Sequence, residues 1–483
     1  MAKQKGICQM CTLGCGFIAE TAGEELIEIE FDFDDPNGQG ALCAKGNSIS
    51  ELLTHPKRLI APVRDAKAIR WEEALPAIGS ALAQLRDKSG ADAIGLVLSG
   101  DATCEEAALA QAFSPSCLKS KNLDVFSPTN DYEVLDALAG GNGATPRASL
   151  QDIRNANCMV AVGDPFATCP VISRRVLDAR QAARGNSINC IAGAPNMTTR
   201  FADAFVQAAE PRGLLAVIKC MLDRTEGNAP AWQKEMKRLL DKAAFEPNET
   251  ASAARIAERF VKAKTAVVLL GTGNPLAAKL AAVLARIGGE GKGIHTSLSY
   301  GNSPFIFEGF QRTISTREIL ERVRAGKVKG LVVLGADIVA GCPDMNVKEA
   351  LGRLELLIAA APFRNRTTEM AHFILPSAIW QEKSGTAMGG HVSALLPPPG
   401  GAKAYSDIMK DIAGAMNMRL QPADWARVER SGGMEHEDIG ALVENGLRDA
   451  FVPPVISTAT RFSDGSITDN VSWRAAVEGG TRR

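Results

Sequence analysis

The sequence predicts an α/β protein in which a small N-terminal β domain precedes two domains built on doubly wound parallel sheets. Short aliphatic and β-branched runs that end in glycine alternate with helical segments several times after residue 90. Repeated β-α units of this kind form parallel sheets that helices cover on both faces. Ahead of them, a loop rich in glycine and cysteine, together with a cysteine at position 43, indicates a separate small domain.

The first β-α unit is the run ADAIGLVLSG at residues 91–100, followed by CEEAALAQAF at 104–113 with helical composition. The same pattern recurs over residues 155–195, 264–289 and 328–362. Because ligands of doubly wound sheets bind at the carboxyl ends of the strands, we expect the ligand-binding residues in the loops that follow the strands.

The chain is expected to divide into four parts. These are an N-terminal domain over 1–60, an α/β domain made of 61–125 and 261–418, an inserted α/β domain over 126–260, and a tail over 419–483. The tail has a short helical stretch around 435–451 and then a proline- and serine-rich irregular end, which is typical of a strap over a partner subunit.

Composition excludes several classes of function. The 483 residues are 46% hydrophobic and 23% charged, as in ordinary globular proteins of several domains. A net charge of -1 and the lack of a Lys/Arg block argue against binding to nucleic acid or an anionic membrane. The N-terminal MAKQKG has no secretory h-region, and no run of about 18 apolar residues occurs, so we expect a cytoplasmic protein without membrane insertion.

Four of the eleven cysteines form a pattern typical of a metal centre. Cys8, Cys11 and Cys15 are followed by Cys43, which gives the spacing C-x2-C-x3-C-x27-C. Three thiolates on one loop and a fourth from a hairpin suit a [4Fe-4S] cluster, in which each iron needs one external sulfur ligand. Structural zinc and unligated thiols are the alternatives, although zinc sites usually present two separated pairs of ligands.

With the segment CAKGNSISELLTHPKRLIAPV that follows, this loop resembles the N-terminus of the molybdopterin oxidoreductases typified by formate dehydrogenases. The resemblance extends over roughly residues 5–418 and implies the fold of that family. It also implies that Lys45, two residues after the fourth cysteine, lies between the cluster and a pterin. The alternative is an ordinary surface lysine beside an anionic cluster.

Two post-strand loops look like copies of one device, namely VAVGDPFATCP at 160–170 and VVLGADIVAGCP at 332–343. The resemblance places them at the two halves of a bis-pterin guanine dinucleotide cofactor. Gly163 and Gly335 would then allow close backbone approach, and Asp164 and Asp337 would accept hydrogen bonds from the ligand. The alternative is that any doubly wound sheet needs glycines at its strand ends.

A third block, TTEMAHFILPSAIWQEKSGT, resembles the family segment that ends in E-K-x-G-T. The resemblance assigns Gly385 and Thr386 to cofactor binding, with Glu382 and Lys383 as the other matching positions. His391, on the glycine-rich stretch that follows, is a candidate for lining a cofactor cleft, or else a histidine of a surface loop.

Three departures from the family bear on function. The stretch 122–144, where the resemblance implies a Cys or selenocysteine ligand of Mo or W, has no cysteine. Ser127 and Asp131 are oxygen donors there, although Asp131 also suits a helix cap or first turn. The sequence INCIAGAPNMTTRFAD lacks the usual D-P-R, with Thr198 and Arg200 nearby. Only about 65 residues follow position 418, where the resemblance implies a further β-barrel domain.

These departures favour an iron-sulfur electron-transfer subunit of a multi-subunit oxidoreductase that has lost its Mo/W-pterin site. The alternative is a catalytic Mo/W-bis-pterin oxidoreductase of formate dehydrogenase or formylmethanofuran dehydrogenase type. A nonredox binding module is a third hypothesis, which leaves the cysteine loop unexplained. An electron-transfer subunit needs redox partners, so we expect iron-sulfur, flavin, or NAD- or ferredoxin-linked subunits.

Overall fold

The structure is a computed structural model that describes residues 1–139, 147–224, 229–342, 345–421 and 439–448, and the backbone of strands at 457–461 and 467–472. The described chain falls into two compact units. Unit 1 contains residues 1–132, residues 299–421 and the two C-terminal strands, and unit 2 contains residues 133–298 and 439–448.

Unit 1 begins with a three-stranded antiparallel sheet in the order β1-β2-β3. Its strands and the two short helices after them are β1 (Ala2–Ile7), β2 (Gly16–Ala22), β3 (Glu25–Phe31), α1 (Ala44–Asn47) and α2 (Ile49–Thr54). On the inner face of β2, Phe17 is fully buried, its ring lies against Gly6, and it meets Trp380 edge-on at 6.4 Å between ring centroids. The small β domain expected from the sequence is therefore present.

The larger sheet of unit 1 has seven strands in the order β5-β4-β15-β14-β13-β6-β7. The five strands β15, β14, β13, β6 and β7 run parallel to one another. At the other edge of the sheet, β4 pairs antiparallel with β15 and with β5. The strands are β4 (Val63–Arg64), β5 (Lys67–Ala68), β6 (Ile94–Ser99), β7 (Leu123–Phe126), β13 (Gly330–Leu334), β14 (Leu356–Ala361) and β15 (Phe373–Pro376).

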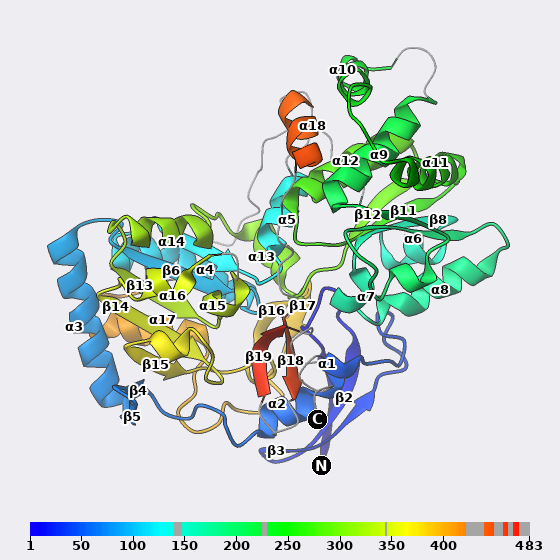
Figure 1. The fold of residues 1–483 in the computed structure, drawn as a ribbon. Coiled ribbons are helices and arrows are strands. Elements are labelled where there is room, and N and C mark those ends of the chain that lie inside the picture. Colours follow the sequence, from blue (N-terminus) through cyan, green and yellow to red (C-terminus); the bar gives the residue numbers. More distant parts are fainter. Residues whose placement is uncertain are drawn as a thin grey trace, which may run out of the picture. The chain divides into compact units, whose positions relative to one another are not determined.

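Helices cover both faces of this sheet (Figure 1). One face carries α3 (Trp71–Ser89), α4 (Cys104–Phe113) and α17 (Tyr405–Ala415), and the other carries α14 (Thr316–Arg324), α15 (Ile338–Gly341) and α16 (Val347–Leu351). Unit 1 also contains α13 (Ser303–Gly309), a π-helical turn (Ser114–Leu118), and the hairpins β16 (Gly385–Ala387) with β17 (Gly390–Val392) and β18 (Ser457–Arg461) with β19 (Ile467–Ser472).

Unit 2 is built on a five-stranded parallel sheet in the order β10-β9-β8-β11-β12. The strands are β8 (Cys158–Gly163), β9 (Ser187–Ala192), β10 (Ala204–Gln207), β11 (Ala266–Gly271) and β12 (Lys292–Thr296). The helices are α6 (Leu150–Arg154), α7 (Pro165–Thr168), α8 (Ile172–Ala182), α9 (Glu210–Leu222), α10 (Ala231–Leu240), α11 (Pro247–Lys262), α12 (Pro275–Gly288) and α18 (Ile439–Arg448), and α5 (Asp131–Ala139) leads in from unit 1. The predicted α/β class with parallel sheets is confirmed.

The boundary between the α/β parts differs from the expectation at 260/261. Strand β11 pairs in parallel with β8 along its whole length, from Ala266 beside Cys158 to Gly271 beside Gly163, and β12 pairs with β11. Every residue of β11 is buried, so this strand needs a neighbour on each side. Periodicity identifies such a strand but does not say which sheet it joins.

The tail contains the helix expected around 435–451, as α18, in which Gly446 lies against Leu215 of α9. Where the sequence analysis expected an irregular end, β18 and β19 form an antiparallel pair, and both strands are rich in β-branched residues. The rest of the tail, at 422–438, 449–456, 462–466 and 473–483, lies outside the described residues.

Candidate functional site

The four cysteines of the N-terminal domain come together in the structure. Cys8, Cys11 and Cys15 are buried, and Cys43 is half-buried at the start of α1. The Cys8 N–H donates to the Cys15 carbonyl at 2.8 Å, which closes the loop between β1 and β2. Burial raises the pKa of the Cys8 and Cys15 thiols, and the neighbouring Cys11 and Cys43 raise the pKa of both further.

One carboxylate shapes the segment that leads to Cys43. Asp35 accepts the backbone N–H of Gly16 at 2.8 Å, that of Asn37 at 3.2 Å, and that of Gly38. Gly38 lies so close to Cys15 that an added Cβ would come within 2.9 Å of the cysteine Cβ. Asp35 and the lack of a side chain at Gly38 therefore fold the 35–43 segment back onto the cysteine loop.

This donor set fits a [4Fe-4S] cluster. A cube of iron and sulfide takes one thiolate on each iron, so the three buried thiols of one loop and the half-buried Cys43 at the start of α1 provide the full set. Thiols bind iron as thiolates, and the cluster irons offset the burial that otherwise keeps Cys8 and Cys15 protonated. Throughout the described part of the chain, no three His, Cys, Asp or Glu side chains converge as ligands of a single ion.

Lys45 is not a surface side chain, since it is only 5% exposed. Its charge is one of the smaller influences on Cys8 and lowers the pKa of that thiol, so its ammonium group lies within electrostatic reach of the thiols. A buried cation next to thiolates stabilises their charged form. Its position between a cluster and a pterin stays a prediction.

A cavity of about 210 Å³ in unit 1 borders the cysteine loop. His391 of β17 is exposed and lines this cavity together with Gln9, which lies between Cys8 and Cys11. Gln381 lines it as well, is 2% exposed, and has no hydrogen-bond partner for either atom of its amide. His391 therefore lies beside the candidate cluster site, and its role in binding a cofactor stays a prediction.

In unit 2, Gly163 and Asp164 end β8, as predicted. Gly163 has φ +75°, a left-handed conformation that favours glycine. The Asp164 carboxylate accepts the N–H of Ala167 at 3.3 Å, the N–H of Met197 at 3.1 Å and the hydroxyl of Thr198 at 2.7 Å. Asp164 thus caps the short helix α7 and ties it to the loop after β9.

In unit 1, the loop after β13 is built in the same way. Gly335 has φ +83°, and the Asp337 carboxylate accepts the N–H of Ala340 at 3.2 Å, the N–H of Arg366 at 3.2 Å and the hydroxyl of Thr367 at 2.7 Å. Burial raises the pKa of Asp337, although these hydrogen bonds oppose the shift. We call this arrangement, in either unit, an Asp–Thr lock.

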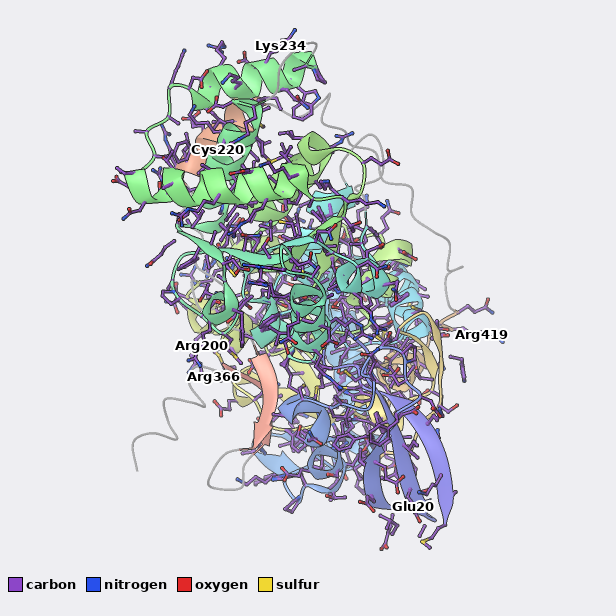
Figure 2. The ribbon with its side chains drawn as sticks, turned by 90° about the vertical axis from the view of Figure 1, so that its right-hand side faces the viewer. Glu20, Arg200, Cys220, Lys234, Arg366 and Arg419 are labelled. Carbon is purple, nitrogen blue, oxygen red and sulfur yellow. The ribbon has the colours of Figure 1, made fainter. Side chains whose placement is uncertain are left out.

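The two locks share several hydrogen bonds over a common N-x-T-T segment. The amide oxygen of Asn196 accepts the N–H of Thr199 at 3.0 Å, and that of Asn365 accepts the N–H of Thr368 at 2.8 Å. The Asn196 side chain also donates to the Gly163 carbonyl at 3.1 Å, whereas the Asn365 amide nitrogen is buried without a partner. The duplication proposed from the loop sequences thus extends to the hydrogen bonds, and both aspartates hold backbone together. Arg200, just after the first segment, is exposed (Figure 2).

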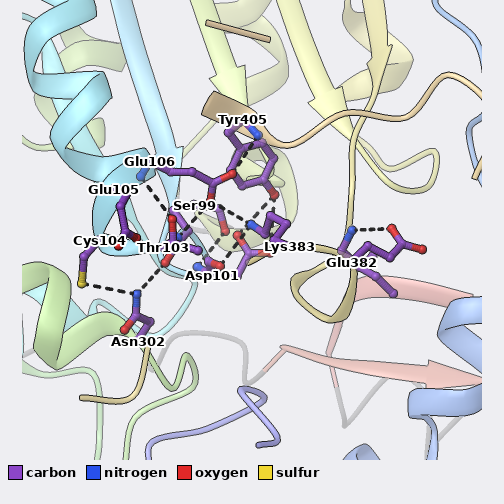
Figure 3. A network of polar contacts seen from close by, with 12 residues as sticks. Ser99, Asp101, Thr103, Cys104, Glu105, Glu106, Asn302, Glu382, Lys383 and Tyr405 are labelled. Atoms are coloured by element: carbon purple, nitrogen blue, oxygen red, sulfur yellow. Dashed lines mark hydrogen bonds and ion pairs between the residues drawn. The ribbon is translucent and has the colours of Figure 1, made fainter. Parts of the chain in front are cut away.

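The E-K-x-G-T block forms a buried polar network, which Figure 3 shows around Lys383. Lys383 pairs with Glu106 at 3.0 Å, and both side chains are buried. The other Glu106 oxygen accepts the N–H of Tyr405 at 2.8 Å, and the Lys383 ammonium group lies 4.1 Å from the centroid of the Tyr405 ring. Glu106 also accepts the Thr103 N–H at 2.9 Å, which caps α4.

The other residues of the block also have partners within unit 1. Glu382 forms a buried bidentate pair with Arg58, at 2.6 and 2.7 Å. Thr386 donates its N–H and its hydroxyl to Glu105 at 2.8 and 2.7 Å, and an added Cβ at Gly385 would come within 2.7 Å of the same carboxylate. Their assignment to cofactor binding stays a prediction, but each has a structural role.

Sequence reasoning missed the partners of this block, namely Arg58, Glu105, Glu106 and Tyr405. The adjacent Glu105 and Glu106 follow Thr103, which is a capping-box signal. Their second role, as partners for residues more than 270 positions away, leaves no mark in the local pattern.

The two candidate metal donors of the 122–144 stretch are both engaged. The Ser127 hydroxyl accepts the Asp131 N–H at 2.7 Å. The Asp131 carboxylate, which is fully buried, accepts the hydroxyls of Thr129 and Ser303 and the N–H of Tyr300. Burial raises the pKa of Asp131. These oxygens of Ser127 and Asp131 therefore hold the start of α5 in place, and this arrangement does not fit a ligand of Mo or W. Residues 140–146 lie outside the described residues.

Comparison with known families gives two matches. The model of the molybdopterin oxidoreductase family matches residues 64–415, and the model of the Fe4S4 domain of molybdopterin oxidoreductases matches residues 1–55. These matches confirm the resemblance seen in the sequence and support a 4Fe-4S cluster in the N-terminal domain. No described helix has both the length and the apolar character needed to cross a membrane.

Individual relatives are distant. The chain is 24% identical to the alpha subunit of a formate dehydrogenase from Methanocaldococcus jannaschii, over 84% of this chain and 69% of that protein. It is 27% identical to the alpha subunit of an NADPH-Fe(3+) oxidoreductase from Geobacter sulfurreducens, over 84% and 55%. Acetylene hydratase from Pelobacter acetylenicus has a similar fold, with a TM-score of 0.67 and 15% identity over 86% of this chain and 69% of that one.

We expect Lys383→Met to destabilise unit 1 by about 3–5 kcal/mol, because it leaves the Glu106 carboxylate buried without its cation. Urea unfolding followed by tryptophan fluorescence measures this loss. The control is Lys410→Met, whose exposed side chain pairs only with Asp407 and which should change stability by about 0.5 kcal/mol or less. If both variants unfold at the same urea concentration, the network does not stabilise the unit.

Gly335→Ala should destabilise unit 1 by about 2–4 kcal/mol, since it adds left-handed backbone strain and an overlap with the Tyr405 hydroxyl. Gly326→Ala is the matched control, with φ +67° and open space around it, so it isolates the backbone contribution of about 1 kcal/mol. Equal losses of stability in the two variants would contradict the close packing at the lock.

Proposed function

Because this chain belongs to the molybdopterin oxidoreductase family, we propose that it is an iron-sulfur electron-transfer subunit of a multi-subunit oxidoreductase. In this proposal Cys8, Cys11, Cys15 and Cys43 hold one [4Fe-4S] cluster, and the chain has lost the Mo/W-pterin site of the family. The observation that carries it is the set of four thiols, three buried and one half-buried, which the closed loop from Cys8 to Cys15 and the contact of Gly38 with Cys15 bring together.

The proposed loss of the metal site rests on the 122–144 stretch. It has no cysteine, and its two oxygen donors, Ser127 and Asp131, are used in hydrogen bonds within unit 1. Binding Mo or W through Asp131 would leave the donors of Ser303 and Tyr300 without their acceptor in a buried site. This conflict favours a protein that transfers electrons without a metal ligand at that position.

Electron transfer by one cluster requires other redox centres, because a [4Fe-4S] cluster carries one electron at a time. We therefore propose partner subunits with iron-sulfur, flavin, or NAD- or ferredoxin-linked centres, in a cytoplasmic complex. In support, two of the relatives are described as alpha subunits, of a formate dehydrogenase and of an NADPH-Fe(3+) oxidoreductase. The chain spans 55% of the length of the NADPH-Fe(3+) oxidoreductase subunit, so we do not assign the whole activity of that protein to this chain.

The second candidate is a catalytic Mo/W-bis-pterin oxidoreductase of formate dehydrogenase or formylmethanofuran dehydrogenase type. The paired Asp–Thr locks favour it, because each sets a left-handed glycine at the carboxyl end of a parallel strand. These are the positions at which ligands of doubly wound sheets bind. When bound, such a cofactor would supply the oxidation of a small substrate.

The metal content of anaerobically purified protein separates the two candidates. We expect about four irons per chain, no Mo, W or zinc above background, and no fluorescence of oxidised pterin, because the four thiols supply one sulfur ligand for each iron of a [4Fe-4S] cluster. Elemental analysis and pterin fluorescence on the same sample measure this. Stoichiometric Mo or W with pterin would replace the proposal by the second candidate, and one zinc per chain would replace the cluster.

A variant identifies the ligands. Cys11→Ser should lower the iron content and change or abolish the EPR signal of the reduced cluster, while far-UV circular dichroism stays that of the folded α/β units. The matched control is Cys220→Ser, a buried cysteine of α9 in unit 2, which should keep its iron. If iron and the EPR signal are unchanged in Cys11→Ser, the thiol set is not the ligand set.

A further inference from the structure

The N-terminal domain is far more acidic than the chain as a whole. Residues 1–43 contain two lysines against eight carboxylates, although the net charge of all 483 residues is -1. Seven of the eight carboxylates are concentrated between positions 24 and 35, in the sequence EELIEIEFDFDD. A local charge excess of this kind creates a field that attracts partners of opposite sign.

Half of these carboxylates have a lysine or backbone N–H partner inside the domain. Lys3 pairs with Glu30 at 2.8 Å and lies 3.6 Å from Glu20, and Lys5 pairs with Asp32 at 2.9 Å. Asp35 is occupied by the backbone N–H groups of the cysteine loop.

The other four carboxylates face solvent. Glu24, Glu25, Glu28 and Asp34 are exposed and form no ion pair with any residue of the described ranges. Lys3 and Lys5, the nearest cations in sequence, already have partners. The uncompensated charge of the domain therefore gathers along β3 and the turn that follows it.

Apolar side chains are exposed on the same edge strand and just after it. Phe31 lies on the face that carries Phe17, and Glu28 lies on the opposite face beside Glu20, so a partner reaches both at the edge of the sheet. Ile27 is 52% exposed, Phe31 is 44% exposed and Phe33 is 79% exposed. Single exposed apolar residues are ordinary, but three within seven residues, two of them aromatic, are typical of an interaction surface. We call Ile27, Phe31 and Phe33, with the four free carboxylates, the β3 surface.

The β3 surface is directly connected to the candidate cluster ligands. The Phe33 ring lies against Gly40, three residues before Cys43, and Gly38 lies against Cys15. A protein seated on Phe33 would thus be separated from the thiols by one short stretch of backbone.

We propose that the β3 surface is the docking site for a basic one-electron carrier protein, which exchanges electrons with the [4Fe-4S] cluster; this inference rests on the proposed function. The partner would present Lys or Arg around an apolar centre, because such a face complements both the carboxylates and the phenyl rings. A second copy of this chain would set carboxylates against carboxylates, which disfavours it. The exchange moves one electron, so the cluster is oxidised by one equivalent, the carrier centre is reduced by one, and no bond forms or breaks.

The test uses the loaded protein, reduced with dithionite and freed of excess reductant, with mitochondrial cytochrome c as a strongly basic probe. Stopped-flow absorbance measures the rate constant for oxidation of the cluster at low and high ionic strength. We expect this rate constant to fall steeply with salt. Glu28→Lys combined with Asp34→Lys should lower it about tenfold at low salt and flatten the salt dependence.

The matched control for the charge change is Asp178→Lys combined with Glu290→Lys, which replaces two exposed carboxylates of unit 2 and changes the net charge by the same amount. Phe33→Ser should lower the rate constant at high salt, because salt screens the charges and binding then depends on the apolar contact. Its control is Val261→Ser, since Val261 is a 47% exposed residue of α11. Rubredoxin, an acidic one-electron acceptor, should react faster with the lysine variant than with the unchanged protein. Equal salt dependence in the lysine variant and in the double control Asp178→Lys with Glu290→Lys would overturn the docking site.

Two further measurements separate failure of this inference from failure of the proposed function. Oxidation by the small neutral dye dichlorophenolindophenol reports the cluster alone and should be equal in all variants. If the purified protein contains no iron, the proposed function is wrong. Calorimetric titration of this iron-free protein with cytochrome c at low salt then still tests the docking site. If Phe33→Ser abolishes self-association seen by light scattering and leaves the cytochrome c rates unchanged, the surface belongs to a second copy and the proposal is wrong.

Discussion

The buried ion pair between Glu106 and Lys383 is the interaction on which the arrangement of unit 1 depends. It joins the start of α4 to the segment after β15, and through the Tyr405 N–H it fixes the start of α17. The two charged groups tolerate little displacement, because separating them would leave each charge unpaired in the low dielectric of the protein interior. Glu382, the residue before Lys383, forms a second buried ion pair, with Arg58, which constrains the same segment. The segment that reaches the cysteine loop is thus held in one position.

Much of the fold could be predicted from the sequence, because its signals are local. The β-α units at β6 and β8 follow from aliphatic runs that end in glycine, and the four cysteines mark their own domain by spacing. The membership of β11 in the sheet of unit 2 was not predictable, since a fully buried strand reads alike in either sheet. The partners of Lys383 and Glu382 were likewise hidden, because a residue pair over 270 positions apart leaves no periodic signal.

The Asp–Thr locks show what sequence similarity between two loops can and cannot tell. A glycine with an aspartate close behind it, followed by Cys-Pro, predicted a duplication, and the shared hydrogen bonds of Asp164 and Asp337 extend the likeness to the loop after the next strand. Both carboxylates accept hydrogen bonds from within the protein, and their role in binding a ligand stays a prediction. The loops differ in that Asn196 donates to a carbonyl, whereas the amide nitrogen of Asn365 has no acceptor among the described residues.

The way Asp35 holds the cysteine loop has a consequence for the assembly of the protein. Its carboxylate gathers the N–H groups of Gly16, Asn37 and Gly38, so one side chain ties the cysteine loop to the segment that ends at Cys43. Small metal domains often fold only when the metal arrives. Here the hydrogen bonds of Asp35 also link the two stretches of chain that carry the thiols, so a change at Asp35 would shift Cys43 relative to the other three cysteines although all four thiols stay in the chain.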